Sequence, residues 1–213
     1  MKMTRSIKFF NRTIGLNIDI SFRCPLECPR CARQFDFRDK GKSVYGHDIS
    51  LDDIKKLARH FKFFDFCGQL SDPVHHPKFI EILKHLYDNK VGAVVHNASS
   101  AKSKSWYIKA FKANPDAKWV FGIDGLPEES CKYRINQDGV KLFNIMLESK
   151  NHLLKLPYWQ YIIFSYNEHH LEQAKKMAQD NNINFMVVQS SRWKDKDDPL
   201  RPSKKYDLGF TRI

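Results

Sequence analysis

The stretch "LNIDISFRCPLECPRC" (residues 16–31) runs from a strand-like segment directly into a cluster of cysteines. Its first half alternates apolar and polar residues and is rich in β-forming side chains, which predicts a strand over residues 16–22. Cys24, Cys28 and Cys31 follow, spaced by four and then three residues. A loop with this spacing can wrap three thiolates around one inorganic centre.

Further along the chain, short apolar segments alternate with amphipathic helical patterns. Strands are predicted at residues 61–68, 91–97, 118–124, 158–165 and 183–189. Between them, helices are predicted at residues 50–61 (with Ser50 as N-cap), 76–89, 103–114, 138–151 and 167–182. This alternation predicts an α/β fold of βαβ units with a mostly parallel sheet, open or curled into a partial barrel. Ligands bind at the carboxyl ends of the strands in such folds, where the cysteines lie.

Length and composition place limits on this fold. The 213 residues, 42% of them hydrophobic, suffice for one sizeable core, so we expect a single domain over residues 1–213. Its barrel core spans 14–190. The polar C-terminal tail over 191–213, with two prolines, is interpreted as an extended or partly disordered end, and packing over the open rim is the alternative. No stretch is long and apolar enough to span a bilayer, which predicts a cytoplasmic protein with no membrane partner. In a reducing cytoplasm, clustered cysteines indicate metal binding or catalysis rather than disulfides.

The chain is strongly basic. Its 36 Lys and Arg against 24 Asp and Glu give a net charge of +12, which favours anionic partners such as nucleic acid or a phosphorylated or carboxylated substrate. The positive residues are scattered, however, and a solvated lysine-rich surface explains them as well.

The three clustered cysteines are an unusual number for a structural zinc site. Such a site commonly has four ligands, often two Cys-x-x-Cys pairs. The other cysteines, Cys67 and Cys131, stand alone at the ends of other predicted elements. Three thiolates suit a four-iron cluster that keeps one iron free to bind a small molecule. Structural zinc and coincidental clustering are the alternatives.

The C-x-x-x-C-x-x-C spacing after a first strand resembles the radical S-adenosylmethionine (radical SAM) superfamily, and the alternating strands resemble its partial (β/α)6 TIM-like barrel. The resemblance covers about residues 14–190. It implies that Cys24, Cys28 and Cys31 bind a [4Fe-4S] cluster and that SAM chelates the free iron. It also implies that an electron, from a flavodoxin- or ferredoxin-like donor, cleaves SAM to a 5′-deoxyadenosyl radical that abstracts a substrate hydrogen. The chain would be a minimal-barrel member without an auxiliary-cluster domain.

The segment "CGQLSDPVHHP" (residues 67–77) is similar to the family's Gly-Gly-Glu-Pro loop, which receives the SAM amino group. By this resemblance, Asp72 replaces the glutamate, and Gly68, Gln69 and Ser71 are the other SAM contacts. The alternative is a simple turn made of Gly, Ser, Asp and Pro.

The segment "GIDGLPEESCKYR" (residues 122–134) is similar to the family segment that meets the SAM ribose and methionine carboxylate. Asp124 and Arg134 occupy those places, and an arginine can bind a carboxylate through two parallel hydrogen bonds. The alternatives are an Asp-Gly turn and an ion pair of Arg134 with Glu128 or Glu129.

Two further strand ends carry candidate pocket residues. Ser165 and Asn167 follow the fifth strand and are candidates to face adenine or substrate, with helix capping as the alternative for Asn167. His96, Asn97 and Ser99 end the third strand, and a hydrogen-bonded core histidine and a helix cap explain them as well.

Three side chains near these motifs have other interpretations. Arg30 precedes the third cysteine, where many family members have an aromatic residue, and can stack on adenine or contact an acidic substrate. Cys67 is interpreted as a buried small hydrophobe. Cys131 is interpreted as an exposed thiol or a hydrogen donor beside the substrate.

Three functional hypotheses result. The first is a radical SAM enzyme acting on an anionic small molecule, a nucleotide or a nucleic acid. The second is the same chemistry on a peptide or protein side chain. The third is a non-enzymatic iron-sulfur or zinc protein that binds nucleic acid. The candidate SAM contacts favour the first two, because a scaffold has no need of a SAM pocket.

Overall fold

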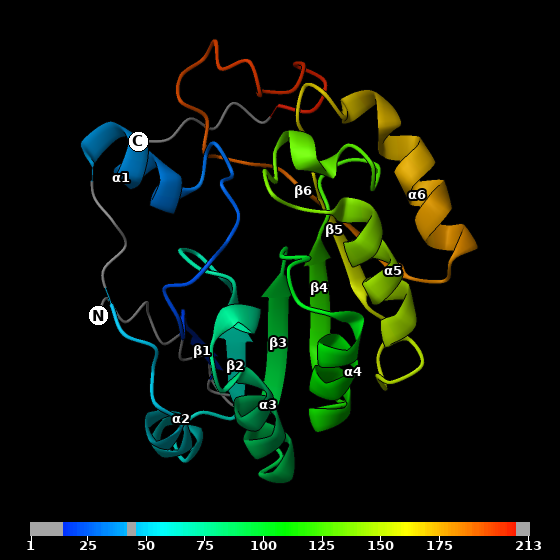
Figure 1. Cartoon of the computed structure of the whole chain (residues 1–213). Coiled ribbons are helices and arrows are strands. Elements are labelled where there is room, and N and C mark those ends of the chain that lie inside the picture. The colour runs from blue at the N-terminus through cyan, green and yellow to red at the C-terminus, as the bar shows by residue number, and fades with distance from the viewer. Residues whose placement is uncertain (1–14, 42–45, 208–213) are drawn as a thin grey trace, which may run out of the picture.

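The computed structural model describes residues 15–41 and 46–207, and within them six parallel strands form one sheet in sequential order (Figure 1). The strands are β1 (Gly15–Asn17), β2 (Phe63–Phe66), β3 (Gly92–Asn97), β4 (Lys118–Gly122), β5 (Tyr158–Ile162) and β6 (Asn184–Val188). Each strand pairs with the next, and the sheet does not close between β1 and β6. The prediction of an α/β partial barrel is therefore confirmed.

Helices connect the strands in the described part of the chain. They are α1 (Ala32–Lys40), α2 (Leu51–Ala58), α3 (Phe79–Asp88), α4 (Lys104–Ala113), α5 (Gly139–Ser149) and α6 (Leu171–Asp180). Short 3-10 turns are η1 (Pro73–His75), η2 (Ser130–Lys132) and η3 (Glu168–His170). The predicted Ser50 cap is confirmed, because its hydroxyl accepts a hydrogen bond from the Asp53 backbone. No helix within the described ranges is long and apolar enough to cross a membrane.

Two local predictions need correction. The first strand is shorter than the predicted 16–22, because β1 ends at Asn17 and the chain continues as a loop toward the cysteines. Helix α1 was not predicted at all. Its sequence, "ARQFDFRDK", has no apolar stripe, and it begins directly after Cys31, whose amide donates to the Cys28 carbonyl.

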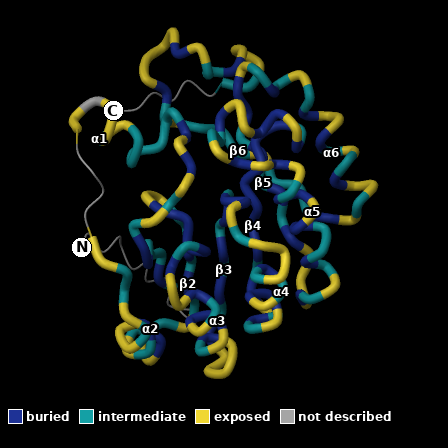
Figure 2. Tube along the Cα trace, viewed as in Figure 1, coloured by how far each residue is buried: buried dark blue, intermediate teal, exposed yellow. Residues whose placement is uncertain are grey.

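Alternate residues of each strand face opposite sides of the sheet. One face buries Phe64, Phe66, Val95, Trp119 and Phe121 in the main core, between the sheet and the helices (Figure 2). The other face points into the partial barrel. Polar side chains on that inner face therefore have no helix to cover them, and they can only line an interior space.

Phe63 fills the inner face near the amino ends of the strands. Its neighbours across β1 and β3 are Gly15 and Gly92. A Cβ atom at Gly92 would lie 2.9 Å from the Phe63 ring, and one at Gly15 would lie 3.3 Å from it. The two glycines therefore make room for the aromatic ring, and the open space is left toward the carboxyl ends.

The segment after β6 packs against the barrel. Trp193 is 2% exposed and Asp198 is 5% exposed. In Figure 1 this segment, orange to red, crosses the same end of the barrel as α1 and the cysteine loop. As far as residue 207 this segment packs against the barrel through Trp193 and Asp198; residues 208–213 lie outside the described residues.

Candidate active site

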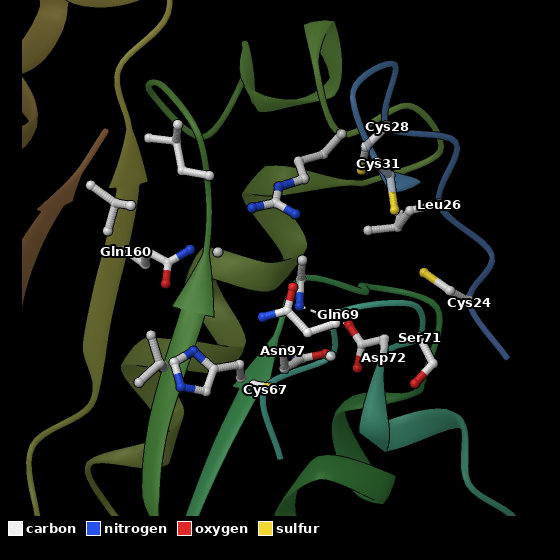
Figure 3. Close-up of a pocket in the computed structure, with 18 of the residues that line it drawn as sticks. Cys24, Leu26, Cys28, Cys31, Cys67, Gln69, Ser71, Asp72, Asn97 and Gln160 are labelled. Atoms are coloured by element: carbon white, nitrogen blue, oxygen red, sulfur yellow. Dashed lines mark hydrogen bonds between the residues drawn. The ribbon is translucent and has the colours of Figure 1, made fainter. Parts of the chain in front are cut away.

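A cavity of about 470 Å³ opens at the carboxyl ends of the strands (Figure 3). The loops after β1 and β2 and the segment after β6 contribute to its wall, together with inner-face side chains of the strands. Sequence-predicted residues that line it are Cys24, Cys28, Cys31, Gly68, Gln69, Ser71, Asp72, His96, Asn97 and Arg134. The fold therefore brings segments that are more than a hundred residues apart to one site.

The three clustered cysteines lie on one wall of this cavity, opposite Gln160 (Figure 3). All three are free thiols, and Cys28 is only 6% exposed. Burial raises the pKa of Cys24 to about 12, with smaller contributions from Asp72 and the other two thiols. Burial also raises the pKa of Cys28, although Arg134 opposes the shift. Thiolates in this place would therefore need a positively charged centre to offset their burial.

The described residues include no group of three or more His, Cys, Asp or Glu side chains arranged to hold a single metal ion. The cysteine loop itself has no fourth protein ligand of the kind that a structural zinc site usually requires; Cys67 lies after β2 and Cys131 lies in η2, outside the cavity. The donor set of three soft thiols around an open space fits a larger iron-sulfur cluster better than one zinc ion.

The loop after β2 has a conformation that only glycine adopts easily. Gly68 has φ +58°, and a Cβ there would lie 2.5 Å from the Ser71 carbonyl oxygen. Asp19 holds the far side of this loop, accepting hydrogen bonds from the Leu70 amide at 3.2 Å and the Ser71 hydroxyl at 3.0 Å. Asp19 was missed at the sequence level, although it lies in the first predicted strand and alternates with its apolar residues.

Asp72 is a buried carboxylate that joins two strand ends. One of its oxygens accepts hydrogen bonds from the Ala98 and Ser99 amides, both at 2.8 Å, and the other accepts from the Val74 amide at 3.2 Å. Burial raises the pKa of Asp72 to about 6 in spite of these bonds. Most of its acceptor capacity is thus used to fix the loops after β2 and β3.

Arg134 enters the cavity from the segment after β4. Its Nε lies 2.6 Å from the Asp124 carboxylate, which is fully buried and also accepts the Ile162 amide at 2.9 Å. Burial raises the pKa of Asp124, and Arg134 opposes that shift. Asp124 itself does not line the cavity, so it positions Arg134. The alternative pairing of Arg134 with Glu128 or Glu129 is not formed; Glu129 instead lies 2.9 Å from His170.

Other predicted pocket residues have structural partners. The Ser165 hydroxyl donates to the Pro199 carbonyl at 2.6 Å. The Asn167 side chain closes the turn after β5, because it accepts a hydrogen bond from the Phe164 amide and donates one to the Ile162 carbonyl. Neither Ser165 nor Asn167 lines the cavity, and Asn167 makes no side-chain cap for the next helix. Ser99 lies outside it too, 2.8 Å from the His75 ring.

Solved structures with the same architecture include Streptococcus suis SuiB bound to S-adenosylmethionine, with a TM-score of 0.66 and 14% identity over 91% of this chain and 44% of that chain. The structure of anSMEcpe with bound AdoMet (SAM) has a TM-score of 0.62 and 18% identity, covering 82% of this chain and 51% of that one. The structure of methylornithine synthase (PylB) has a TM-score of 0.64 and 11% identity, covering 91% of this chain and 58% of that one.

The chain shares the fold of these solved structures, a partial barrel of parallel strands. It spans about half the length of these solved structures. No protein-family model matches the sequence, and no curated protein matches it either.

Within this fold, the segment after β6 packs against the cysteine loop. Trp193 packs in a small cluster with Leu26, Cys28, Tyr133 and Phe164. Arg192 lines the cavity and donates to the Gln69 side-chain oxygen at 2.8 Å. Arg30 does not line the cavity; contrary to its interpretation as an adenine or substrate contact, it pairs with Asp198.

The two lone cysteines also differ from their interpretations. Cys67 lines the cavity, and its thiol donates to the Asn17 side-chain oxygen at 2.8 Å, so it is not simply a buried hydrophobe. Cys131 is exposed, lies outside the cavity and contacts the Glu128 carbonyl at 3.7 Å. Its position fits an exposed thiol and not a hydrogen donor beside the substrate.

Proposed function

We propose that this protein is a radical SAM enzyme, with a [4Fe-4S] cluster on Cys24, Cys28 and Cys31 and SAM in the adjoining cavity. The observation that carries the proposal is the arrangement of three free cysteines and Arg134 around one cavity at the carboxyl ends of the strands. Similar folds hold SAM in solved structures. The cavity volume lies within the range of about 300–1,000 Å³ typical of small-molecule sites.

The residues present fit such a cluster. The three cysteines offer soft thiolate donors, and Arg134, in hydrogen-bond contact with Cys28, places a positive charge beside them. When bound, the cluster supplies the electron that cleaves SAM into methionine and a 5′-deoxyadenosyl radical, which takes a hydrogen atom from the substrate. The protein holds the cluster, orients SAM and keeps water away.

Arg134 is the residue that we assign to the methionine carboxylate of SAM. Its Nε is engaged by Asp124, so the guanidinium plane is fixed and its Nη groups are left to face the cavity. Asp124 acts through Arg134 and not on the ribose. Gly68, Gln69 and Ser71 form the loop that we assign to the amino group of SAM, and Asp72 holds that loop in place.

The substrate stays open between two classes. A peptide or protein substrate is the second functional candidate of the sequence, and it gains support because SuiB bound to its precursor peptide and anSMEcpe with a bound peptide have this fold. The hypothesis of an anionic substrate (a small molecule, a nucleotide or a nucleic acid) is supported only by the net charge of +12. A flavodoxin- or ferredoxin-like electron donor and a cytoplasmic location stay predictions.

The test is anaerobic reconstitution with iron and sulfide, then reduction with dithionite, addition of SAM and chromatography for 5′-deoxyadenosine. We expect the nucleoside from the wild-type protein and from the matched control Cys131→Ala, and none from Cys31→Ala. Failure of the reconstituted protein to bind SAM in a titration would overturn the proposal in favour of a non-enzymatic iron-sulfur protein.

A further inference from the structure

Five polar residues of the cavity wall are not used by the proposed cluster and SAM contacts. They are Asn17 on β1, Asp65 on β2, His96 on β3 and Gln160 on β5, with Gln189 just after β6. We call these five residues the lower chamber. The interior of a closed (β/α)8 barrel is filled by branched apolar side chains, whereas these five side chains are polar and face an open cavity.

The lower chamber contains hydrogen-bond acceptors without partners in the described structure. Asp65 Oδ1 and Gln189 Oε1 are buried and make no hydrogen bond. His96 Nε2 lies 3.2 Å from Asp65 Oδ1 but is not aligned as a hydrogen-bond donor, whereas Asp65 Oδ2 accepts from the Asn17 amide at 3.1 Å. Since buried acceptors are almost always paired in folded proteins, these oxygens indicate a place for a ligand.

Gln160 adds to this set from the opposite wall. Its side chain points into the cavity (Figure 3). The side-chain amide makes no hydrogen bond with any other described residue. Its neighbours in register are Gly122 on β4 and Met186 on β6, neither of which offers a polar side-chain partner. Its amide oxygen is therefore available to a ligand that lies between β2 and β5.

Both arginines of the cavity wall already have side-chain partners. Among the described lining residues, the arginines are Arg134, held by Asp124, and Arg192, held by Gln69; both lie with the cysteines or the loop after β2. Lys118 on β4 does not line the cavity; its ammonium lies over the Tyr158 ring, 3.8 Å from the centroid. The five residues of the lower chamber include a carboxylate and two amide oxygens but no Lys or Arg, and the nearby Arg134 is paired with Asp124, which disfavours a phosphate or carboxylate ligand.

We propose that the lower chamber binds an ammonium group of the substrate, with Asp65 as its charge partner and with Gln160 and Gln189 accepting further N–H or O–H donors. The inference rests on the proposed function, because the substrate must lie in the same cavity as SAM. An ammonium has three donors and no acceptor, so it can satisfy Asp65 Oδ1 where an anion cannot. Asn17 holds the carboxylate through its other oxygen, Asp65 Oδ2. Both a small amine and a lysine side chain carry this group.

The test measures binding to the reconstituted protein, with and without SAM, by ligand-observed NMR. The probes are n-butylammonium, n-butanol and butyrate, which share a carbon chain and differ in charge. We expect n-butylammonium to bind best and butyrate not to bind. N-acetyl-lysine-N-methylamide, compared with its norleucine analogue, distinguishes a lysine side chain from a small free amine.

Asp65→Asn should weaken n-butylammonium binding at least tenfold, and Gln160→Leu should weaken it to a smaller extent. Asp116→Asn is the matched control, because Asp116 is an exposed carboxylate paired with Lys155 outside the cavity. Circular dichroism establishes that each variant is folded. If the Asp65→Asn variant does not fold, the affinity of the Gln160→Leu variant decides the test.

Butyrate binding as tightly as n-butylammonium, or an unchanged affinity in the folded variants, would overturn the inference. The two proposals fail separately. Cleavage of SAM without any preference for the amine overturns the lower chamber assignment only. Asp65-dependent amine binding in a protein that neither binds nor cleaves SAM supports the lower chamber and overturns the proposed function.

Discussion

Arg30 and Asp198 lie 168 positions apart in the chain and form a two-point ion pair, with Nε–Oδ2 at 2.6 Å and Nη2–Oδ1 at 3.0 Å. The Asp198 side chain is fully buried, and it also accepts hydrogen bonds from the Lys194 and Leu200 amides. This pair joins the cysteine loop after β1 to the segment after β6, bridging the strands between which the sheet is open. The proposed cluster loop therefore depends on the end of the chain for its position.

Asp198→Ala should loosen the cysteine loop. Removing the carboxylate leaves Arg30 without its partner and frees two backbone amides, which we expect to lower the free energy of unfolding by about 2 kcal/mol. Urea denaturation measures this change, and the reconstituted variant should also lose iron faster than wild type. Asp52→Ala removes an exposed pair with Lys55 and should cost at most about 0.5 kcal/mol. Equal effects from the two variants would contradict the bridging role.

Gly68→Ala should impair SAM binding and lower stability. The substitution meets both an unfavourable φ of +58° and the Ser71 carbonyl at 2.5 Å, so we expect a cost of about 2–3 kcal/mol. Gly41→Ala is the matched control, because Gly41 has φ +61° with open space around it, and its cost should be about 1 kcal/mol. Thermal unfolding and SAM titration measure both variants. If the Gly68→Ala variant loses no more stability than the Gly41→Ala variant, the Ser71 carbonyl moves away from the new Cβ at little cost.

Arg134→Lys should separate SAM binding from cluster binding. A lysine keeps the positive charge beside Asp124 but loses the planar pair of donors, so SAM affinity should fall at least tenfold, about 1.4 kcal/mol. Iron content after reconstitution should stay near the wild-type value. Arg192→Lys, at a site bonded to a neutral amide, should change SAM affinity less. The assignment of Arg134 fails if the Arg134→Lys variant binds SAM with wild-type affinity.

The cysteines should divide into two groups by iron content. Cys24→Ala, Cys28→Ala and Cys31→Ala should each abolish the cluster, while Cys67→Ala and Cys131→Ala should retain it. Cys67 is the more demanding control, because it lines the same cavity. Iron and sulfide analysis after reconstitution measures all five variants, and iron loss from either control would disprove the three-ligand assignment.

Stability should depend on pH through His75. Burial, helped by the charge of Lys102, lowers the pKa of His75 from 6.5 to about 4. Between these values the unfolded chain binds the proton and the folded chain does not, so the free energy of unfolding falls as pH drops from about 6.5 to 4. His75→Gln removes this contribution, and its stability relative to wild type should rise over that range. Denaturant unfolding at several pH values measures the difference; a constant difference would contradict the lowered pKa.

How far the sequence predicted the structure differs between elements. The helices after Ser50 and the alternating strands were found because their apolar periodicity is local and each residue's burial follows from its place in the repeat. Helix α1 was missed because it has no apolar stripe and begins directly after the turn in which the Cys31 amide donates to the Cys28 carbonyl. Ser165 and Asn167 were placed at the correct strand end, but strand-end position alone does not tell whether a side chain faces the cavity or closes a turn.

The sequence by itself determined the order of strands and helices, the loop that carries the three cysteines, and the resemblance to radical SAM enzymes, because each depends on spacing along the chain. Only the tertiary structure decided that Arg30 pairs with Asp198, that Asp19 holds the loop after β2, and that Asp65 and Gln160 face one chamber. The physical reason is that a polar side chain bonds to whatever group the sheet register and barrel curvature bring beside it. Those neighbours lie dozens to hundreds of residues away, where local periodicity carries no information.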